Sequence, residues 1–244
     1  MQHRIHGTTL QSLEILLQPG EMVFSQTHQM AWMDDGITMD TSTGGGVMKG
    51  LLRSMSGGSL FVTHFSAQQG STGLVAFCPR FPGTIIARQL GPGESLICRK
   101  ETFLCAESSV ELEIFFRQQI GSGLFGGEGF ILQKVTGPGM VFLDLSGEVV
   151  EKSLDHGERL QVHVGHVGIQ EPYVSFSITM MRGFRNVLFG GDGLFLATMT
   201  GPGKIWLQSM PIINLAEEIF RHAPGSGNKP SGGAGGLLGT LLGG

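Results

Sequence analysis

The feature that most constrains the fold is a stretch of 21 residues that occurs twice in the chain. Residues 124–144 and 188–208 align without a gap at an offset of 64 positions, and 11 of the 21 positions are identical. Both copies contain Thr-Gly-Pro-Gly, at residues 136–139 and 200–203, and an aromatic residue with a leucine follows each. Self-similarity of this kind indicates internal duplication, so we expect a fold built from a recurring unit.

The same frame extends beyond these two stretches. Gly157-Glu158 opens the last unit and Gly93-Glu94 opens the one before it, while a weaker third copy begins at Pro19-Gly20-Glu21. This third copy matches the others only if an insertion near residues 68–72 is allowed. We therefore predict three diverged units, at about residues 20–92, 93–156 and 157–210.

Within each unit the apolar residues recur with a period of two. Residues 173–180 alternate between polar and apolar side chains, which predicts a β-strand with one buried face. Residues 30–41 predict a hairpin that turns at Asp35-Gly36. Forty glycines, many in GG and GPG steps, are typical of turns between many short strands. We expect four or five strands per unit, closing into a barrel, a sandwich or a prism, with Phe142 and Trp206 buried in equivalent places.

The C-terminal part of the sequence predicts one helix and a tail. Residues 211–221 begin with Pro211 and place Ile212, Leu215, Ala216 and Ile219 on one face, so we expect this helix to pack on a sheet. Residues 223–244 form a glycine-rich tail that carries four leucines: Leu237, Leu238, Leu241 and Leu242. These leucines either contact apolar surface of the same subunit, a neighbouring subunit, a partner or a membrane, or belong to a disordered segment.

Charge and cysteine content limit the classes of function. The net charge is −4 and only 15% of residues are charged, which disfavours a strongly basic nucleic-acid binder but leaves a local cationic patch as an alternative. Three cysteines, Cys78, Cys98 and Cys105, form no CxxC pair and predict free thiols, as in a reducing cytoplasm. The first residues lack the apolar core of a signal peptide, and no apolar run reaches transmembrane length. We expect a cytoplasmic protein.

The motifs that could indicate a catalytic site are better explained by strand and turn structure. His163 and His166 have an HxxH spacing, but residues three apart on a strand point to opposite faces, so the two imidazoles cannot share a metal ion without a bulge. The glycine-rich loops at residues 126–129 and 190–193 contain an acidic residue where an anion would sit, and neither precedes a helix. We predict no enzymatic activity, no catalytic residue, no metal and no cofactor.

One cluster of cations precedes the double glycines of the three units. Its members are Lys49, Arg53, Arg117, Arg182 and Arg185. If the units are related by pseudo-symmetry, these side chains ring one end of the molecule and form a footprint for an anion, a lipid headgroup or an RNA backbone. Ordinary solubilising loop charge is the alternative.

The paired FGG[ED]G…TGPG motifs, with the following aromatic-leucine step and the terminal helix, resemble a family of uncharacterised proteins. These are relatives of the mitochondrial protein named for altered inheritance of mitochondria. The resemblance covers about residues 5–222 and implies a fold similar to the tryptophan RNA-binding attenuation protein (TRAP). It implies one TRAP-like all-β domain at residues 1–222, arranged as a double-stranded β-helix or β-sandwich, and carries over no catalytic residues.

The sequence thus favours a non-enzymatic, homo-oligomeric β scaffold that presents loops or its tail to a protein partner or a membrane surface. Low charge and abundant Met and Phe support assembly. The alternative is a ligand- or RNA-binding module of the TRAP-like fold.

Overall fold

The computed structural model of the chain describes residues 1–26, 29–41, 62–68, 70–119, 129–181, 194–212, 215 and 219. These residues form nineteen β-strands, and the prediction of an all-β fold is confirmed. After β1 (Gln2–His6), the strands form three consecutive groups of six. The first group is β2 (Ser12–Leu17), β3 (Met22–Gln26), β4 (Met30–Met33), β5 (Ile37–Asp40), β6 (Val62–Ala67) and β7 (Gly73–Phe77).

The second and third groups follow the same order of elements. The second group is β8 (Gly83–Leu90), β9 (Ser95–Arg99), β10 (Phe103–Glu107), β11 (Glu111–Gln118), β12 (Phe130–Thr136) and β13 (Gly139–Ser146). The third group is β14 (Val149–Leu154), β15 (Arg159–His163), β16 (Val167–Gln170), β17 (Ser175–Met181), β18 (Leu194–Thr200) and β19 (Gly203–Gln208). A 3-10 turn, η2 (Lys100–Thr102) or η3 (Val164–His166), joins the second and third strands of each of these two groups.

The elements of the second and third groups keep the 64-residue offset seen in the sequence. β9 and β15, η2 and η3, and β12 and β18 each begin and end 64 positions apart. Each unit expected from the sequence begins at the second strand of a group; the first two units end with the first strand of the next group, and the third ends after β19. The strand groups therefore start one strand earlier than the expected boundaries.

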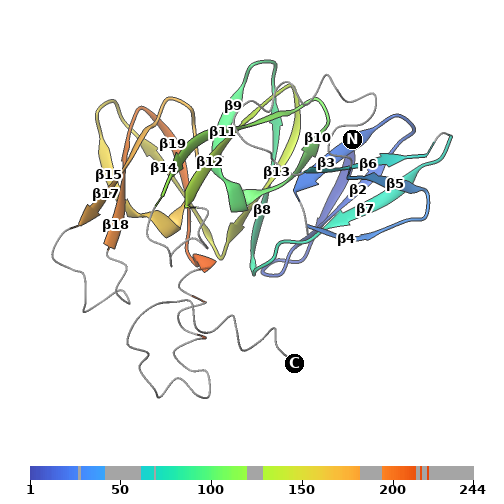
Figure 1. Ribbon diagram of the computed structural model, residues 1–244, viewed down its shortest axis with the longest axis horizontal. Coiled ribbons are helices and arrows are strands. Elements are labelled where there is room, and N and C mark those ends of the chain that lie inside the picture. Colours follow the sequence, from blue (N-terminus) through green and yellow to red (C-terminus); the bar gives the residue numbers. More distant parts are fainter. Residues whose placement is uncertain are drawn as a thin grey trace.

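Four antiparallel sheets follow one another along the long axis of the molecule (Figure 1). Their strand orders are β1-β2-β7-β4 in sheet A, β5-β6-β3-β10-β13-β8 in sheet B, β11-β12-β9-β16-β19-β14 in sheet C and β15-β18-β17 in sheet D. Each group thus places its first, sixth and third strands in one sheet and its second, fifth and fourth strands in the next, the interleaved order of a double-stranded β-helix. Sheets B and C each contain strands of two groups.

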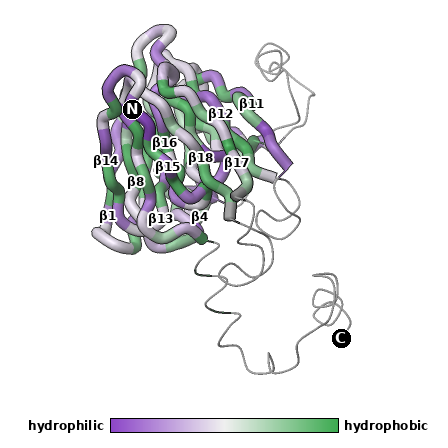
Figure 2. Tube along the Cα trace, turned by 90° about the vertical axis from the view of Figure 1, so that its left-hand side faces the viewer, coloured by the Kyte–Doolittle hydropathy of each residue, from purple (hydrophilic) through white to green (hydrophobic). Residues whose placement is uncertain are grey.

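Three hydrophobic cores fill the spaces between successive sheets. One core joins sheets A and B around Phe65 and Phe77, a second joins B and C around Phe103 and Leu143, and a third joins C and D around Phe130. The inner sheets contribute side chains to both of their faces, because neighbouring strand residues point in opposite directions. Figure 2 shows the alternation of hydropathy along the strands at the sheet D end.

The duplicated stretches have matching local structure in their described parts. Each forms strand, Thr-Gly-Pro-Gly turn, strand, with Gly139 at φ 144° and Gly203 at φ 139°. The expectation that Phe142 and Trp206 are buried is confirmed, at 0% and 5% exposure. Gly127 and Gly191, expected at equivalent turns, lie outside the described residues.

The hairpin predicted at residues 30–41 is wrong. The turn and both strands are present, but β4 pairs with β7 in sheet A while β5 pairs with β6 in sheet B. The chain crosses from sheet A to sheet B at this turn. β4 and β5 therefore lie in different sheets, on opposite sides of a core, and do not pair with each other.

The helix predicted at residues 211–221 is described at three positions only. Ile212, Leu215 and Ile219 are helical, and Pro211 before them is buried. Ile212 and Ile219 are 37% and 60% exposed, and the packing of this helix on a sheet stays a prediction.

Candidate functional site

The cationic patch and the tail proposed from the sequence lie mostly outside the described residues. Arg117 is exposed on β11, an edge strand of sheet C. Lys49, Arg53, Arg182 and Arg185 are not among the described residues, and neither are Leu237, Leu238, Leu241 and Leu242. The structure therefore leaves the patch and the tail contact as predictions.

The two histidines of the HxxH spacing do meet, contrary to the strand argument. η3 replaces the expected strand between them and brings the ring centroids of His163 and His166 to 5.9 Å. Burial lowers the pKa of His163, and His166 and Arg99 nearby lower it further. His166 Nδ1 lies 2.8 Å from the carbonyl oxygen of Gln208. Within the described ranges no three His, Cys, Asp or Glu side chains cluster as metal ligands.

Arg99 is a buried cation that the sequence reasoning missed. It is 3% exposed, and its guanidinium donates to Glu101 Oε2 at 3.1 Å and to the Gly165 carbonyl oxygen at 3.3 Å. It also lies over the ring of Phe130, 5.3 Å from the centroid. Since Arg99 ends β9 and Gly165 lies in η3, these contacts tie the second strand group to the third.

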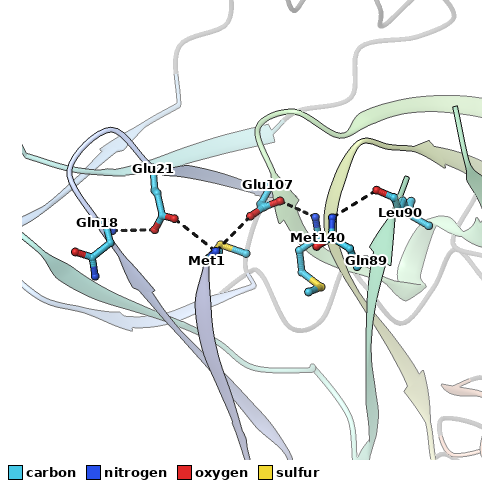
Figure 3. Close-up of polar contacts among 7 residues, drawn as sticks. All are labelled: Met1, Gln18, Glu21, Gln89, Leu90, Glu107 and Met140. Atoms are coloured by element: carbon cyan, nitrogen blue, oxygen red, sulfur yellow. Dashed lines mark hydrogen bonds and ion pairs between the residues drawn. The ribbon is translucent and has the colours of Figure 1, made fainter. Parts of the chain in front are cut away.

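A second ionic contact ties the first group to the second (Figure 3). The amino group of Met1 lies 3.6 Å from Glu21 and 3.9 Å from Glu107, with its side chain 2% exposed. Each carboxylate also accepts a backbone N–H, Glu21 from Gln18 at 2.9 Å and Glu107 from Met140 at 2.7 Å. A carboxylate likewise accepts a hydrogen bond from a backbone N–H at four further residues: Glu94, Glu158, Asp34 and Glu171. These acidic residues therefore fix the backbone at turns and at strand ends.

Several polar side chains are buried with an unsatisfied atom. Asp144 on β13 is 9% exposed, its Oδ1 has no hydrogen-bond partner, and burial raises its pKa to about 7. His64 on β6 is equally buried with Nδ1 unpartnered, and burial lowers its pKa against the opposing effect of Asp40. Burial also raises the pKa of Cys98 and Cys105, so both remain protonated thiols. All three cysteines are free, as predicted.

One edge strand, β4, carries two large apolar side chains that are adjacent and exposed. Trp32 and Met33 on β4 are 46% and 36% exposed, at the edge of sheet A. Exposed strand edges promote pairing with another chain, and natural proteins usually protect them with charge or with covering segments. Residues 30–33 are all apolar in the sequence, but so are residues 74–77 and 103–106 of β7 and β10, so the sequence alone does not single out β4.

At the other end of the molecule, β15 forms an edge of sheet D (Figure 1). Arg159 and Gln161 on it are exposed, the residues between and after them are less exposed, and Val162 is 7% exposed. We call the outer edge of β4 and the outer edge of β15 the two end edges. In the described part of the chain, no helix is long and apolar enough to span a lipid bilayer.

Comparison with known proteins gives concordant results. A family model described as mitochondrial biogenesis AIM24 matches residues 3–210. An uncharacterized protein of Streptococcus pyogenes serotype M6 is 30% identical over an alignment of 224 residues, and the alignment covers 88% of each chain. The X-ray structure of another Streptococcus pyogenes protein, a structural genomics target, has a TM-score of 0.72 at 25% identity and covers 91% of this chain and 100% of its own.

Proposed function

Since this chain belongs to the family described as mitochondrial biogenesis AIM24, we propose that it is a non-enzymatic β scaffold that self-associates. The scaffold presents its loops or its C-terminal tail to a protein partner or a membrane surface. We further propose that it is cytoplasmic and that its three strand groups are diverged copies of one TRAP-like unit. The free cysteines and the 64-residue offset between corresponding elements support these two points.

The observation that carries self-association is the apolar surface of β4. Aromatic residues and methionine are enriched at protein interfaces, and one aromatic ring can contribute 150–250 Å² of buried area, as a rough figure. Trp32 and Met33 place such side chains on an edge whose backbone groups are also available for a ladder. Both features favour a second polypeptide over a small substrate.

Sedimentation velocity on the full chain tests this proposal. We expect a concentration-dependent oligomer for the native chain and a shift toward monomer for Trp32→Lys, because a charge on the edge opposes strand pairing. The matched control is Phe115→Lys, which changes an aromatic residue of similar exposure (50%) on another edge strand, β11, and should leave the distribution unchanged. A native chain that stays monomeric at every concentration would overturn self-association.

The alternative from the sequence, a ligand- or RNA-binding module, depends on cations of which the structure describes Arg117 alone. Binding to RNA or to anionic vesicles that weakens with salt and with Arg182→Ala plus Arg185→Ala would favour this alternative.

A further inference from the structure

The way the three strand groups join within the chain suggests how two chains join. The first group joins the second where β3 pairs with β10, and the second joins the third where β9 pairs with β16. In both joins the second strand of one group pairs with the third strand of the next. These two pairings make sheets B and C continuous across neighbouring groups.

The two end edges belong to the two strands that correspond to those in these joins but that have no such partner among the described residues. β15 is the second strand of the last group, and β4 is the third strand of the first group. Both lie at sheet edges among the described residues, although their counterparts β3, β9, β10 and β16 all lie inside sheets. Because β4 and β15 lie at opposite ends of the molecule (Figure 1), they do not pair within one chain.

The backbone of β4 has the same irregularity as the strands that are joined. Its pairing with β7 shifts register between Met30 and Trp32, as that of β10 with β13 does between Phe103 and Cys105. β16 shifts between Val167 and Ile169 in the corresponding place. An inserted residue of this kind bends a strand, so the outer edge of β4 is shaped like those of β10 and β16.

Burial differs sharply between the joined strands and β4. The counterparts of Trp32 are Cys105 and Ile169, at 0% and 2% exposure, whereas Trp32 is 46% exposed. The counterparts of Met33 are Ala106 and Gln170, at 0% and 1%, whereas Met33 is 36% exposed. β10 and β16 lie in inner sheets covered on both faces, whereas β4 lies in an end sheet with one core and has no neighbouring strand at its outer edge in the described part of the chain.

We infer that β15 of a second copy of this chain pairs antiparallel with β4, with Trp32 opposite Val162 and Met33 opposite Gln161. This inference rests on the proposed self-association and names its contact. Both internal joins give this register independently, since Cys105 lies opposite Ser25 and Ile169 lies opposite Cys98. Ser25, Cys98 and Val162 are each the fourth residue of their strand.

The pairing extends sheet D of one copy into sheet A of the next. The joined sheet has the order β17-β18-β15-β4-β7-β2-β1 and keeps the strand arrangement found in sheets B and C. Each copy offers two different edges, so the contact is head-to-tail, and copies link into a closed ring or an open row. Gln161 occupies the position that Phe24 and Ile97 occupy in the two pairings within the chain. Because Gln161 is polar, the contact between copies is more polar than the contacts within a chain.

Cross-linking between two cysteine variants tests the register. Met33→Cys and Gln161→Cys are made separately in a Cys78→Ser background, which leaves only the buried Cys98 and Cys105. Residues directly opposite in an antiparallel pair have Cβ atoms about 4.5–5.5 Å apart, within reach of a short bismaleimide. We expect a covalent dimer in the mixture and at least tenfold less in either variant alone.

The control replaces Gln161→Cys with Thr179→Cys, an exposed residue on β17 at the other edge of sheet D. This mixture should give no dimer above background. Oligomers that form without the Met33–Gln161 cross-link, or a Met33→Cys variant that links only to itself, would overturn this contact and leave self-association standing. A chain that is monomeric in sedimentation would overturn both the contact and the proposed function.

Discussion

At the scale of single residues, Asp144 gives a pH-dependent prediction. Burial raises the folded-state pKa of this carboxyl to about 7 from 3.8, so between these values the folded chain holds a proton that the unfolded chain has released. Stability therefore falls as the pH rises from 3.8 to 7. We expect Asp144→Asn, which cannot ionise, to increase the free energy of unfolding above pH 7 by up to about 4 kcal/mol.

Urea denaturation at pH 4.5, 6 and 8.5 measures this effect. The gain from Asp144→Asn should be largest at pH 8.5 and should shrink steadily toward pH 4.5. Asp155→Asn, at an exposed position, is the control and should show no such trend. An equal gain at all three values would mean that the amide acts through packing rather than through the charge.

At the scale of elements, the Thr-Gly-Pro-Gly turns give the next prediction. A Cβ at Gly137 would lie 2.6 Å from the Gly91 carbonyl oxygen, and one at Gly201 would lie 2.4 Å from the Asp155 carbonyl oxygen. Backbone atoms cannot move aside as a flexible side chain can. We expect Gly137→Ala and Gly201→Ala each to cost roughly 1–3 kcal/mol, the usual range for overpacked sites, in urea denaturation.

Gly91→Ala is the matched control for these turn variants. A Cβ there would meet only Glu94 Oε2, at 3.5 Å, which is an ordinary contact. If Gly91→Ala were as destabilising as Gly137→Ala, close backbone approach would not explain why glycine occupies the turn.

The sequence predicts where strands and turns occur better than it predicts which strands pair with each other. Alternation at residues 173–180 predicts β17, and the Asp35-Gly36 step correctly predicts a turn, because both signals are local. The hairpin there was wrong because β4 pairs with β7, about 40 residues further on, and short-range pattern carries no information on that pairing. Likewise, η3 turns His163 toward His166 through backbone geometry that a strand period does not predict.

The candidate interaction surface could also be predicted from the sequence only in part. The apolar run of β4 was visible in the sequence, but its meaning depends on which strands lie at edges, and only the sheet order shows that β4 and β15 lack the neighbours of their counterparts. The cation patch, by contrast, depended on pseudo-symmetry alone, and the structure describes only Arg117 of it.

At the scale of the whole molecule, we expect stability and the proposed assembly to depend on different parts of the chain. The three cores contain residues from Leu13 to Trp206, and the inner sheets B and C are covered on both faces. Sheets A and D contribute to one core each, so the molecule has two unlike ends. A change that affects assembly alone is therefore expected at the ends or beyond Trp206.

Deletion of residues 224–244 tests this separation. The four tail leucines could contribute several kcal/mol if buried, at about 25 cal/mol per Å² of apolar area. Fixing a glycine-rich segment costs about 1–2 kcal/mol per residue, which nearly offsets that gain. We expect the truncated chain to keep the melting temperature of the full chain in calorimetry, because the described core residues end at Trp206. Its oligomer distribution or its binding to a partner or to vesicles should change. A truncated chain that failed to fold would show that the tail belongs to a core, and one unchanged in every assay would remove the tail from the proposed function.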